Sequence, residues 1–116
     1  MKRIALIFIA GCAVAFPGAA WAGGSLAGVD GPGFTITLKQ AGKGVKTLKA
    51  GAYTITVQDK SSIHNFHLVG PGVNKLTTVS FTGAKTWNVT LKPGTYTYQC
   101  DVHASFGMKG TFRVTK

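Results

Sequence analysis

The chain has 116 residues, which is enough for one domain, and its net charge of +10 comes from 13 basic and 3 acidic residues. The acidic residues are Asp30, Asp59 and Asp101, with no glutamate, so hydrolysis by a pair of carboxylates has almost no candidates. The excess positive charge favours an anionic partner or surface, or serves solubility alone. Nucleic-acid binding is disfavoured, because no motif of that kind is present.

The first residues predict a cleaved secretory signal peptide. Residues 1–3 are basic, residues 4–16 are apolar, and Ala20-Trp21-Ala22 fits the small-x-small cleavage rule. The apolar run is too short to span a bilayer comfortably. We therefore expect cleavage after Ala22, so that residues 1–22 are removed and the protein is periplasmic or secreted.

The two cysteines, Cys12 and Cys100, depend on that cleavage differently. Cleavage removes Cys12 and leaves Cys100 without a partner for an internal disulfide. A competing interpretation is that residues 9–12, Ile-Ala-Gly-Cys, form a bacterial lipobox, which would make Cys12 a lipidated N-terminus. An idle exposed thiol is a liability in an oxidising compartment, so Cys100 is either a buried apolar residue or a bound ligand.

Residues 23–33 are rich in glycine and predict a flexible leader, after which a single domain covers residues 34–116. In that domain, alternation of apolar and polar residues predicts strands, and signals such as Pro93-Gly94 predict the turns between them. There is no helical stripe of useful length. We expect an all-β fold, a two-sheet antiparallel Greek-key sandwich of about seven or eight strands. The expected strands are 34–39, 53–58, 64–69, 87–92, 95–100 and 111–115, with weaker candidates at 45–48 and 76–81.

Cys100, His103 and Met108 follow one another with the spacing C-x2-H-x4-M. A thiolate, an imidazole and a thioether make a poor catalytic set but a good set of copper ligands, because the sulfur donors are soft and imidazole suits both oxidation states. Alternation places Cys100 on the inward face with Tyr96 and Tyr98, at the end of a core strand. A loop that then returns into the last strand brings all three donors to one rim.

The segment 64–69 supplies a second imidazole. His64, Phe66 and Leu68 share the apolar face of this expected strand, whereas His67 lies with Asn65 on the other face. We therefore expect His64 to be the ligand and His67 to be a surface or second-sheet residue. Two histidines, one cysteine and a weak axial methionine are the ligands of a blue-copper electron-transfer site.

These motifs resemble those of the small cupredoxins of the plastocyanin/azurin family, over essentially all of residues 34–116. The most specific segments are His64-Asn65 and the loop 100–108. The resemblance implies one type 1 copper per chain, and hydrogen bonds from Asn65 that join the two ligand loops. It assigns His64, Cys100 and His103 as equatorial ligands and Met108 as the axial ligand.

The chain departs from the family pattern at two positions of the ligand loop. Val102 stands where plastocyanins commonly have proline, which removes a stiff residue. Asp101 stands where serine or threonine is common, and a carboxylate beside the thiolate weakens the site unless Asn65 or a backbone N–H satisfies it. The acidic patches of plant plastocyanin have no counterpart, so the partner need not be the same.

The leading hypothesis is an exported carrier of single electrons between redox proteins, not an enzyme. We expect a monomer without a stable membrane span, whose partners carry an anionic docking face. The edge of His103 is then the electron port, with Phe106 and Pro71 as an apolar docking rim. The cluster Lys39, Lys43, Lys46 and Lys49 is expected to form a local basic patch.

Other functions remain open at this point. Copper storage or delivery would use the same residues with an exchangeable metal. A nitrite-reductase-like enzyme needs a second copper site, for which only His67 remains. A zinc site of Cys100 and histidines leaves Met108 unexplained, and the last alternative is a metal-free sandwich.

Overall fold

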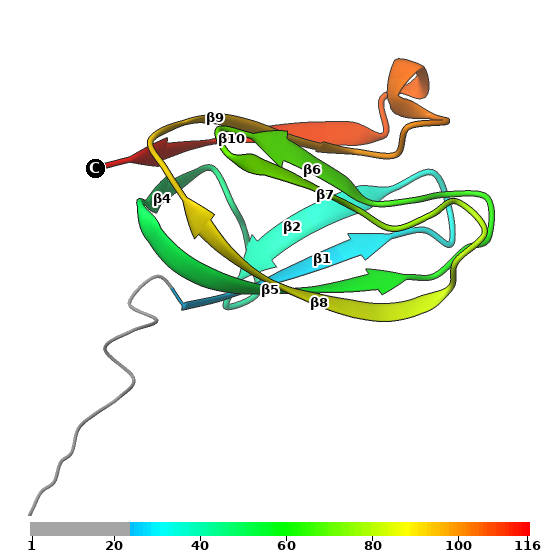
Figure 1. Ribbon diagram of the computed structural model, residues 1–116. Helices are drawn as coiled ribbons and strands as arrows, with labels where there is room; N and C mark the ends of the chain where they lie inside the picture. Colours follow the sequence, from blue (N-terminus) through cyan, green and yellow to red (C-terminus); the bar gives the residue numbers. More distant parts are fainter. Residues whose placement is uncertain (1–23) are drawn as a thin grey trace, which may run out of the picture.

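The computed structural model describes residues 24–116, which form two β-sheets packed face to face (Figure 1). The first sheet has the strand order β3-β2-β1-β5-β8, and the second has the order β4-β10-β9-β6-β7. The strands of the first sheet are β1 (Gly24–Asp30), β2 (Ile36–Gln40), β3 (Lys43–Gly44), β5 (Gly51–Asp59) and β8 (Gly83–Leu91). Those of the second are β4 (Thr47–Lys49), β6 (His67–Gly70), β7 (Val73–Leu76), β9 (Gly94–Gln99) and β10 (Lys109–Thr115).

The all-β, two-sheet sandwich expected from the sequence is confirmed, but each sheet is mixed. β1 pairs with β5 in parallel, β10 pairs with β4 in parallel, and the other pairs are antiparallel. Alternation of apolar and polar residues indicates which face a side chain takes but carries no information on strand direction. The expected strand at 76–81 is wrong for most of its length, because β7 ends at Leu76.

The core lies between the sheets and follows the alternation of the strands. Tyr53, Ile55 and Val57 of β5 are buried, while Thr56 and Gln58 between and beside them are exposed. Aromatic rings from the second sheet stack within the core, with Tyr96 and Phe112 centroids 5.2 Å apart. Full burial of one such side chain stabilises the fold by about 1.5–3 kcal/mol.

The glycine-rich leader expected over residues 23–33 is wrong for Gly24–Asp30, which form β1. This strand lies inside the first sheet, antiparallel to β2 on one side and parallel to β5 on the other. Its inward side chains are Leu26, Gly28 and Asp30. Gly28 leaves room for Phe66, because a Cβ at this position would lie 2.8 Å from the Cζ atom of that ring.

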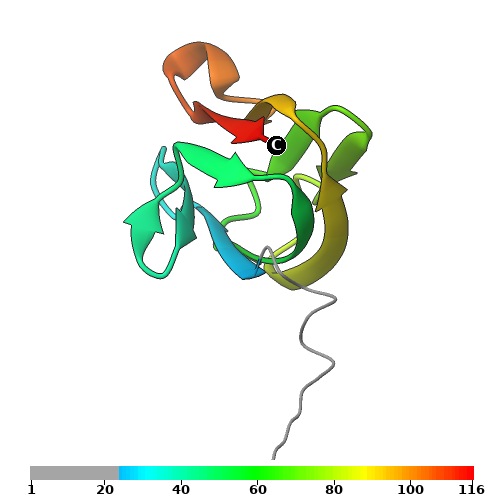
Figure 2. The same ribbon diagram turned by 90° about the vertical axis from the view of Figure 1, so that its left-hand side faces the viewer.

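The strand order gathers four loops at one end of the sandwich. These are the loops from β1 to β2, from β5 to β6, from β7 to β8 and from β9 to β10, the last of which contains the short 3-10 helix Ala104–Phe106. The helix lies at the end away from the C-terminus (Figure 1), whereas the end that carries the C-terminus faces the viewer in Figure 2. We call the first the loop end and the second the far end. Among residues 24–116, no helix is long and apolar enough to span a membrane.

Candidate metal centre

His64 lies in the loop between β5 and β6 and is fully buried. The sequence predicted that a strand starts at His64, but β6 starts only at His67, because a turn precedes it in which the His64 N–H donates to the Ser61 carbonyl at 3.3 Å. The expected difference in burial is confirmed. His64, Phe66 and Leu68 are all 0 % exposed, and the His67 side chain is 20 % exposed.

Cys100 follows β9 and opens the loop that returns into β10. Backbone hydrogen bonds close this loop at its base, since the Cys100 N–H donates to the Met108 carbonyl at 3.0 Å and the Met108 N–H donates to the His103 carbonyl at 3.3 Å. Gly107 ends the 3-10 helix with a φ of 92°, a left-handed conformation that favours glycine. The loop therefore fixes the relative positions of Cys100, His103 and Met108 through its own backbone.

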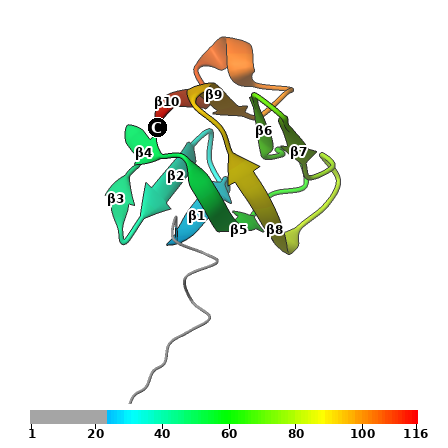
Figure 3. The same cartoon turned by 60° about the vertical axis from the view of Figure 1, so that its left-hand side comes forward.

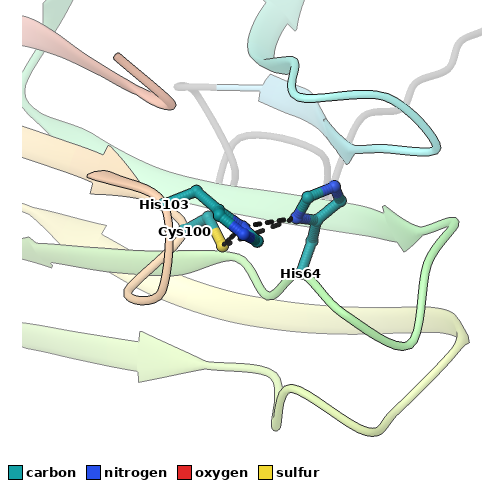
Figure 4. Close-up of side chains that lie close together, drawn as sticks. All are labelled: His64, Cys100 and His103. Atoms are coloured by element: carbon teal, nitrogen blue, oxygen red, sulfur yellow. Dashed lines mark hydrogen bonds between the residues drawn. The ribbon is translucent and has the colours of Figure 1, made fainter. Parts of the chain in front are cut away.

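Three side-chain donors from these two loops meet at one point (Figure 4). The Nδ1 atoms of His64 and His103 lie 2.9 Å apart, and the Cys100 Sγ atom lies 3.8 Å from the first and 3.6 Å from the second. A point equidistant from the three atoms is about 2.0 Å from each, which is close to the usual length of metal–nitrogen and metal–sulfur bonds. The residues therefore fit a bound metal ion.

The chemistry of the donors selects among metals. Two imidazole nitrogens and one thiol sulfur suit copper, zinc or iron, and a thioether favours copper. Met108 is 1 % exposed, and its backbone is hydrogen-bonded to the backbones of both Cys100 and His103. All four sequence-predicted ligands therefore come from the two loops that meet at the loop end.

Asn65 joins the two ligand loops. Its side-chain Nδ2 donates to the Thr77 carbonyl at 3.1 Å and to Asp101 Oδ2 at 3.0 Å, and its Oδ1 accepts from the Asp101 N–H at 2.8 Å. Asn65 is 1 % exposed, so these bonds are shielded from water. The hydrogen bonds between loops that the family resemblance implied for Asn65 are present.

Asp101 is further held by two residues that the sequence did not connect to it. His67 Nδ1 lies 2.9 Å from Asp101 Oδ1, Gln99 Nε2 donates to the same oxygen at 3.1 Å, and His67 Nε2 lies 2.6 Å from Asn74 Oδ1. Burial alone would raise the pKa of Asp101, but the bonds from His67, Asn65 and Gln99 outweigh it and lower that pKa. Burial alone would lower the pKa of His67, but Asn74 and Asp101 outweigh it, so the pKa of His67 lies above its usual value.

A buried pair of carboxyl groups lies beneath the His64 loop. Asp30 and Asp59 are partners in the parallel pairing of β1 with β5 and are 0 % and 3 % exposed. The Asp59 carboxylate accepts from the Ser61 N–H at 3.2 Å and from Thr77 Oγ1 at 3.1 Å. Burial, together with the hydrogen bond and charge of Asp59, raises the pKa of Asp30 to about 8, so this carboxyl is protonated at neutral pH.

Phe34 is a residue of this site that the sequence misplaced. It was expected to begin a strand over residues 34–39, but β2 begins at Ile36, and Phe34 lies in the β1–β2 loop with 58 % of its surface exposed. Its ring meets those of both histidines edge to face, with centroids 4.5 Å from His103 and 5.1 Å from His64. Phe34 therefore covers the two imidazoles from the solvent side.

Of the two residues expected to form the docking rim, Phe106 lies near His103 and Pro71 does not. Phe106 is 75 % exposed, and its ring centroid lies 6.1 Å from that of His103. Pro71 lies instead in the turn after β6, where its carbonyl accepts from the Tyr96 hydroxyl at 3.2 Å. Because β6 runs away from the loop end, this turn is at the far end of the molecule.

Comparison with known proteins identifies the family. Residues 32–115 match the family described as copper binding proteins, plastocyanin/azurin family. Reduced rusticyanin has a similar fold, with 21 % identity over 80 % of each chain and a TM-score of 0.59. Rusticyanin from Thiobacillus ferrooxidans has 22 % identity over 80 % of this chain and 78 % of its own, with a TM-score of 0.57. A chain of a heme-copper terminal oxidase dimer has 17 % identity over 78 % of this chain and 63 % of its own, with a TM-score of 0.55.

No curated protein matches the sequence of this chain. At identities this low, the similarity to solved structures supports the fold alone, and the family match adds the copper-binding character. The cluster of His64, Cys100 and His103 supplies the donors that such a metal needs. This chain therefore belongs to the plastocyanin/azurin family of copper-binding proteins, and its cofactor is copper.

Proposed function

We propose that this protein is an exported type 1 copper protein that carries single electrons between redox partners. In this proposal His64, Cys100 and His103 are the equatorial ligands and Met108 is the weak axial ligand. The observation that supports it is the approach of two imidazole Nδ1 atoms and one buried thiol sulfur to within 3.8 Å of one another. Copper bound there supplies a Cu(II)/Cu(I) couple, and no substrate is transformed.

The surroundings of the donors suit electron transfer better than release of the metal. His64 and Cys100 are 0 % exposed, so the path for a chelator or an acceptor protein to reach them is closed. His103 is only partly buried, and the centroid of its ring lies 4.5 Å from that of Phe34 and 6.1 Å from that of Phe106. The edge of His103 is therefore the route by which an electron enters and leaves without opening the site.

The test is a titration of the metal-free protein with Cu(II), followed by visible spectroscopy and voltammetry. One equivalent should give an intense band at the red end, from charge transfer between the Cys100 thiolate and the metal, and a reversible one-electron wave. Cys100→Ser should abolish the band and His64→Ala should disrupt the site. His67→Ala is the matched control and should retain the band, because His67 contacts Asp101 and Asn74 and is not part of the donor cluster.

Two results would count against this proposal. A colourless protein at stoichiometric Cu(II), with no reversible wave, would remove the electron-carrier function. Rapid loss of copper to a chelator would favour the alternative function, copper storage or delivery.

The docking surface follows from the exposed apolar residues around the centre. Phe34, Ile63, Val102 and Phe106 are between 52 % and 75 % exposed, and each belongs to one of the loops at the loop end. Partners with an anionic face should be attracted by the positive charge of the mature chain, which keeps 11 basic and 3 acidic residues (net +8) once Lys2 and Arg3 are removed. Reduction by such a partner should slow as the salt concentration rises, whereas a rate indifferent to salt would limit the charge to a role in solubility.

Export is proposed from residues 1–22, which lie outside the residues that the structure describes. Mass spectrometry of the exported protein tests it, with Gly23 as the expected N-terminus. A mass that fits a diacylated Cys12 would indicate a lipoprotein instead.

A further inference from the structure

The basic residues of the sandwich include a group that lies away from the metal centre. We call this group the cationic flank, and it occupies β2, β3, β4 and β10, which are neighbours on one side of the molecule (Figure 3). Its residues are all exposed and comprise Lys39, Lys43, Lys46, Lys49, Arg113 and Lys116.

Strand pairing and hydrogen bonds show that these residues are neighbours in space. Lys39 pairs with Gly44, next to Lys43, in the β2–β3 ladder. The Arg113 N–H donates to the Lys46 carbonyl at 3.0 Å, and Lys49 Nζ donates to the main-chain oxygen of Lys116 at 3.5 Å. The flank therefore runs from the edge of one sheet to the edge of the other.

No carboxylate side chain balances this charge. The three acidic residues of the chain are Asp30 and Asp59, which are buried, and Asp101, which pairs with His67 at the loop end. The large apolar residues that are exposed in residues 24–116 also lie outside the strands of the flank. The flank is thus a surface of positive charge without apolar anchors.

These features disfavour a protein partner for the flank. The cores of protein interfaces are enriched in aromatic residues and methionine and are depleted of lysine, whereas five of the six flank residues are lysines. Clustered lysines without apolar anchors are instead typical of surfaces that bind anionic lipid headgroups by charge alone. The redox partner, moreover, needs the apolar loop end, where the metal ligands lie.

We propose that the cationic flank binds the surface of membranes rich in anionic phospholipids, while the loop end with the metal ligands faces away from the lipid. The contact is peripheral and electrostatic, so it weakens as salt rises. It holds the carrier close to membrane-bound partners without covering the route through His103. The inference is independent of the metal, since none of the six flank residues lies in the metal centre.

The test is flotation of the protein with vesicles, after its N-terminus has been determined by mass spectrometry. The probes are vesicles of phosphatidylcholine alone and vesicles that also contain phosphatidylglycerol. Binding only to the anionic vesicles is expected. A variant with Lys39, Lys43, Lys46 and Lys49 all changed to glutamine should lose affinity by roughly several hundredfold, because each lysine near an anionic leaflet contributes about fivefold.

A second variant keeps the experiment specific. Changing Lys60, Lys75, Lys85 and Lys109 to glutamine removes the same charge from exposed positions in the half of the sandwich nearer the loop end, and should retain most of the binding. Equal losses in the two variants would show that only net charge matters, and would overturn the proposal. Equal binding to neutral vesicles would show that the apolar run of residues 4–16 makes the contact. No binding to anionic vesicles would leave an acidic protein as the partner of the flank. Either result would overturn the proposal as well.

Discussion

Asp101 places a negative charge next to Cys100 in sequence, and its neighbours explain how the loop tolerates it. The carboxylate accepts hydrogen bonds from Asn65 and Gln99 and pairs with His67, whose two ring nitrogens both face acceptors. An imidazole between two acceptors is stabilised in its protonated, cationic form. The charge of Asp101 is therefore balanced by His67 of the neighbouring strand β6.

Met108→Leu tests the axial role of the thioether at the scale of one residue. Leucine has a similar volume and preserves the packing of this buried position, but it offers no lone pair to the metal. The visible band should persist and the reduction potential should rise, because a weak donor to Cu(II) has been removed. The measurements are visible spectroscopy and voltammetry, with the neighbouring exposed Lys109→Gln as the control. An unchanged potential would show that Met108 is not a ligand.

At the scale of the element, β1 is the longest strand that the sequence did not predict. Two of its inward positions are Gly28, where the Phe66 ring fills the space, and Asp30, which faces Asp59. An inward face of leucine, glycine and aspartate lacks the apolar alternation by which a strand is recognised. β5, β8, β9 and β10 carried that alternation and were largely predicted, whereas the short strands β3 and β7 were missed as well.

Leu26→Ala distinguishes a core strand from a flexible leader. Leu26 is 2 % exposed, so truncation should lower the free energy of unfolding by about 2–4 kcal/mol. Ser25→Ala on the exposed side of β1 is the matched control and should change it by less than about 0.5 kcal/mol. Denaturant unfolding of the metal-free protein gives both values. A Leu26 variant as stable as the wild type would mean that β1 is not part of the cooperative fold.

The ligand loop shows what local sequence can supply. Cys100, His103 and Met108 lie on one continuous segment whose spacing was visible directly, and His64 followed from the alternation around it. Phe34 and the pairing of His67 with Asp101 depend on contacts between distant segments, such as the register that sets His67 opposite Gln99. Such register has no local signature, so these two contributions needed the structure.

At the scale of the whole molecule, the buried Asp30–Asp59 pair couples stability to pH. The pKa of Asp30 is raised from 3.8 to about 8 by burial and by Asp59, so the folded state holds a proton that the unfolded state releases above pH 3.8. The folded state thus binds more protons than the unfolded state over this window. Stability should therefore be greatest at the acidic side of the window and should fall as pH rises towards 8.

The expected loss between pH 5 and pH 7 is about 1–3 kcal/mol in the free energy of unfolding. Asp30→Asn keeps the shape of the side chain and removes the titration, so its unfolding free energy should depend less on pH over the same range. Chemical denaturation at several pH values measures both slopes, and Asp101, whose pKa is lowered, titrates below this window. Equal slopes in the wild type and the variant would exclude Asp30 as the source.

The burial of Cys100 also means that its thiol is protected only after the newly made chain has folded. Cys100 is 0 % exposed in the folded protein, where neither a second thiol nor a bulky oxidant can reach its sulfur. Before the sandwich closes, the same thiol is open to cross-linking with other chains and to oxidation beyond the reversible stages. In oxidising surroundings, the yield of folded protein therefore depends on whether the two sheets close before the Cys100 thiol is oxidised or cross-linked.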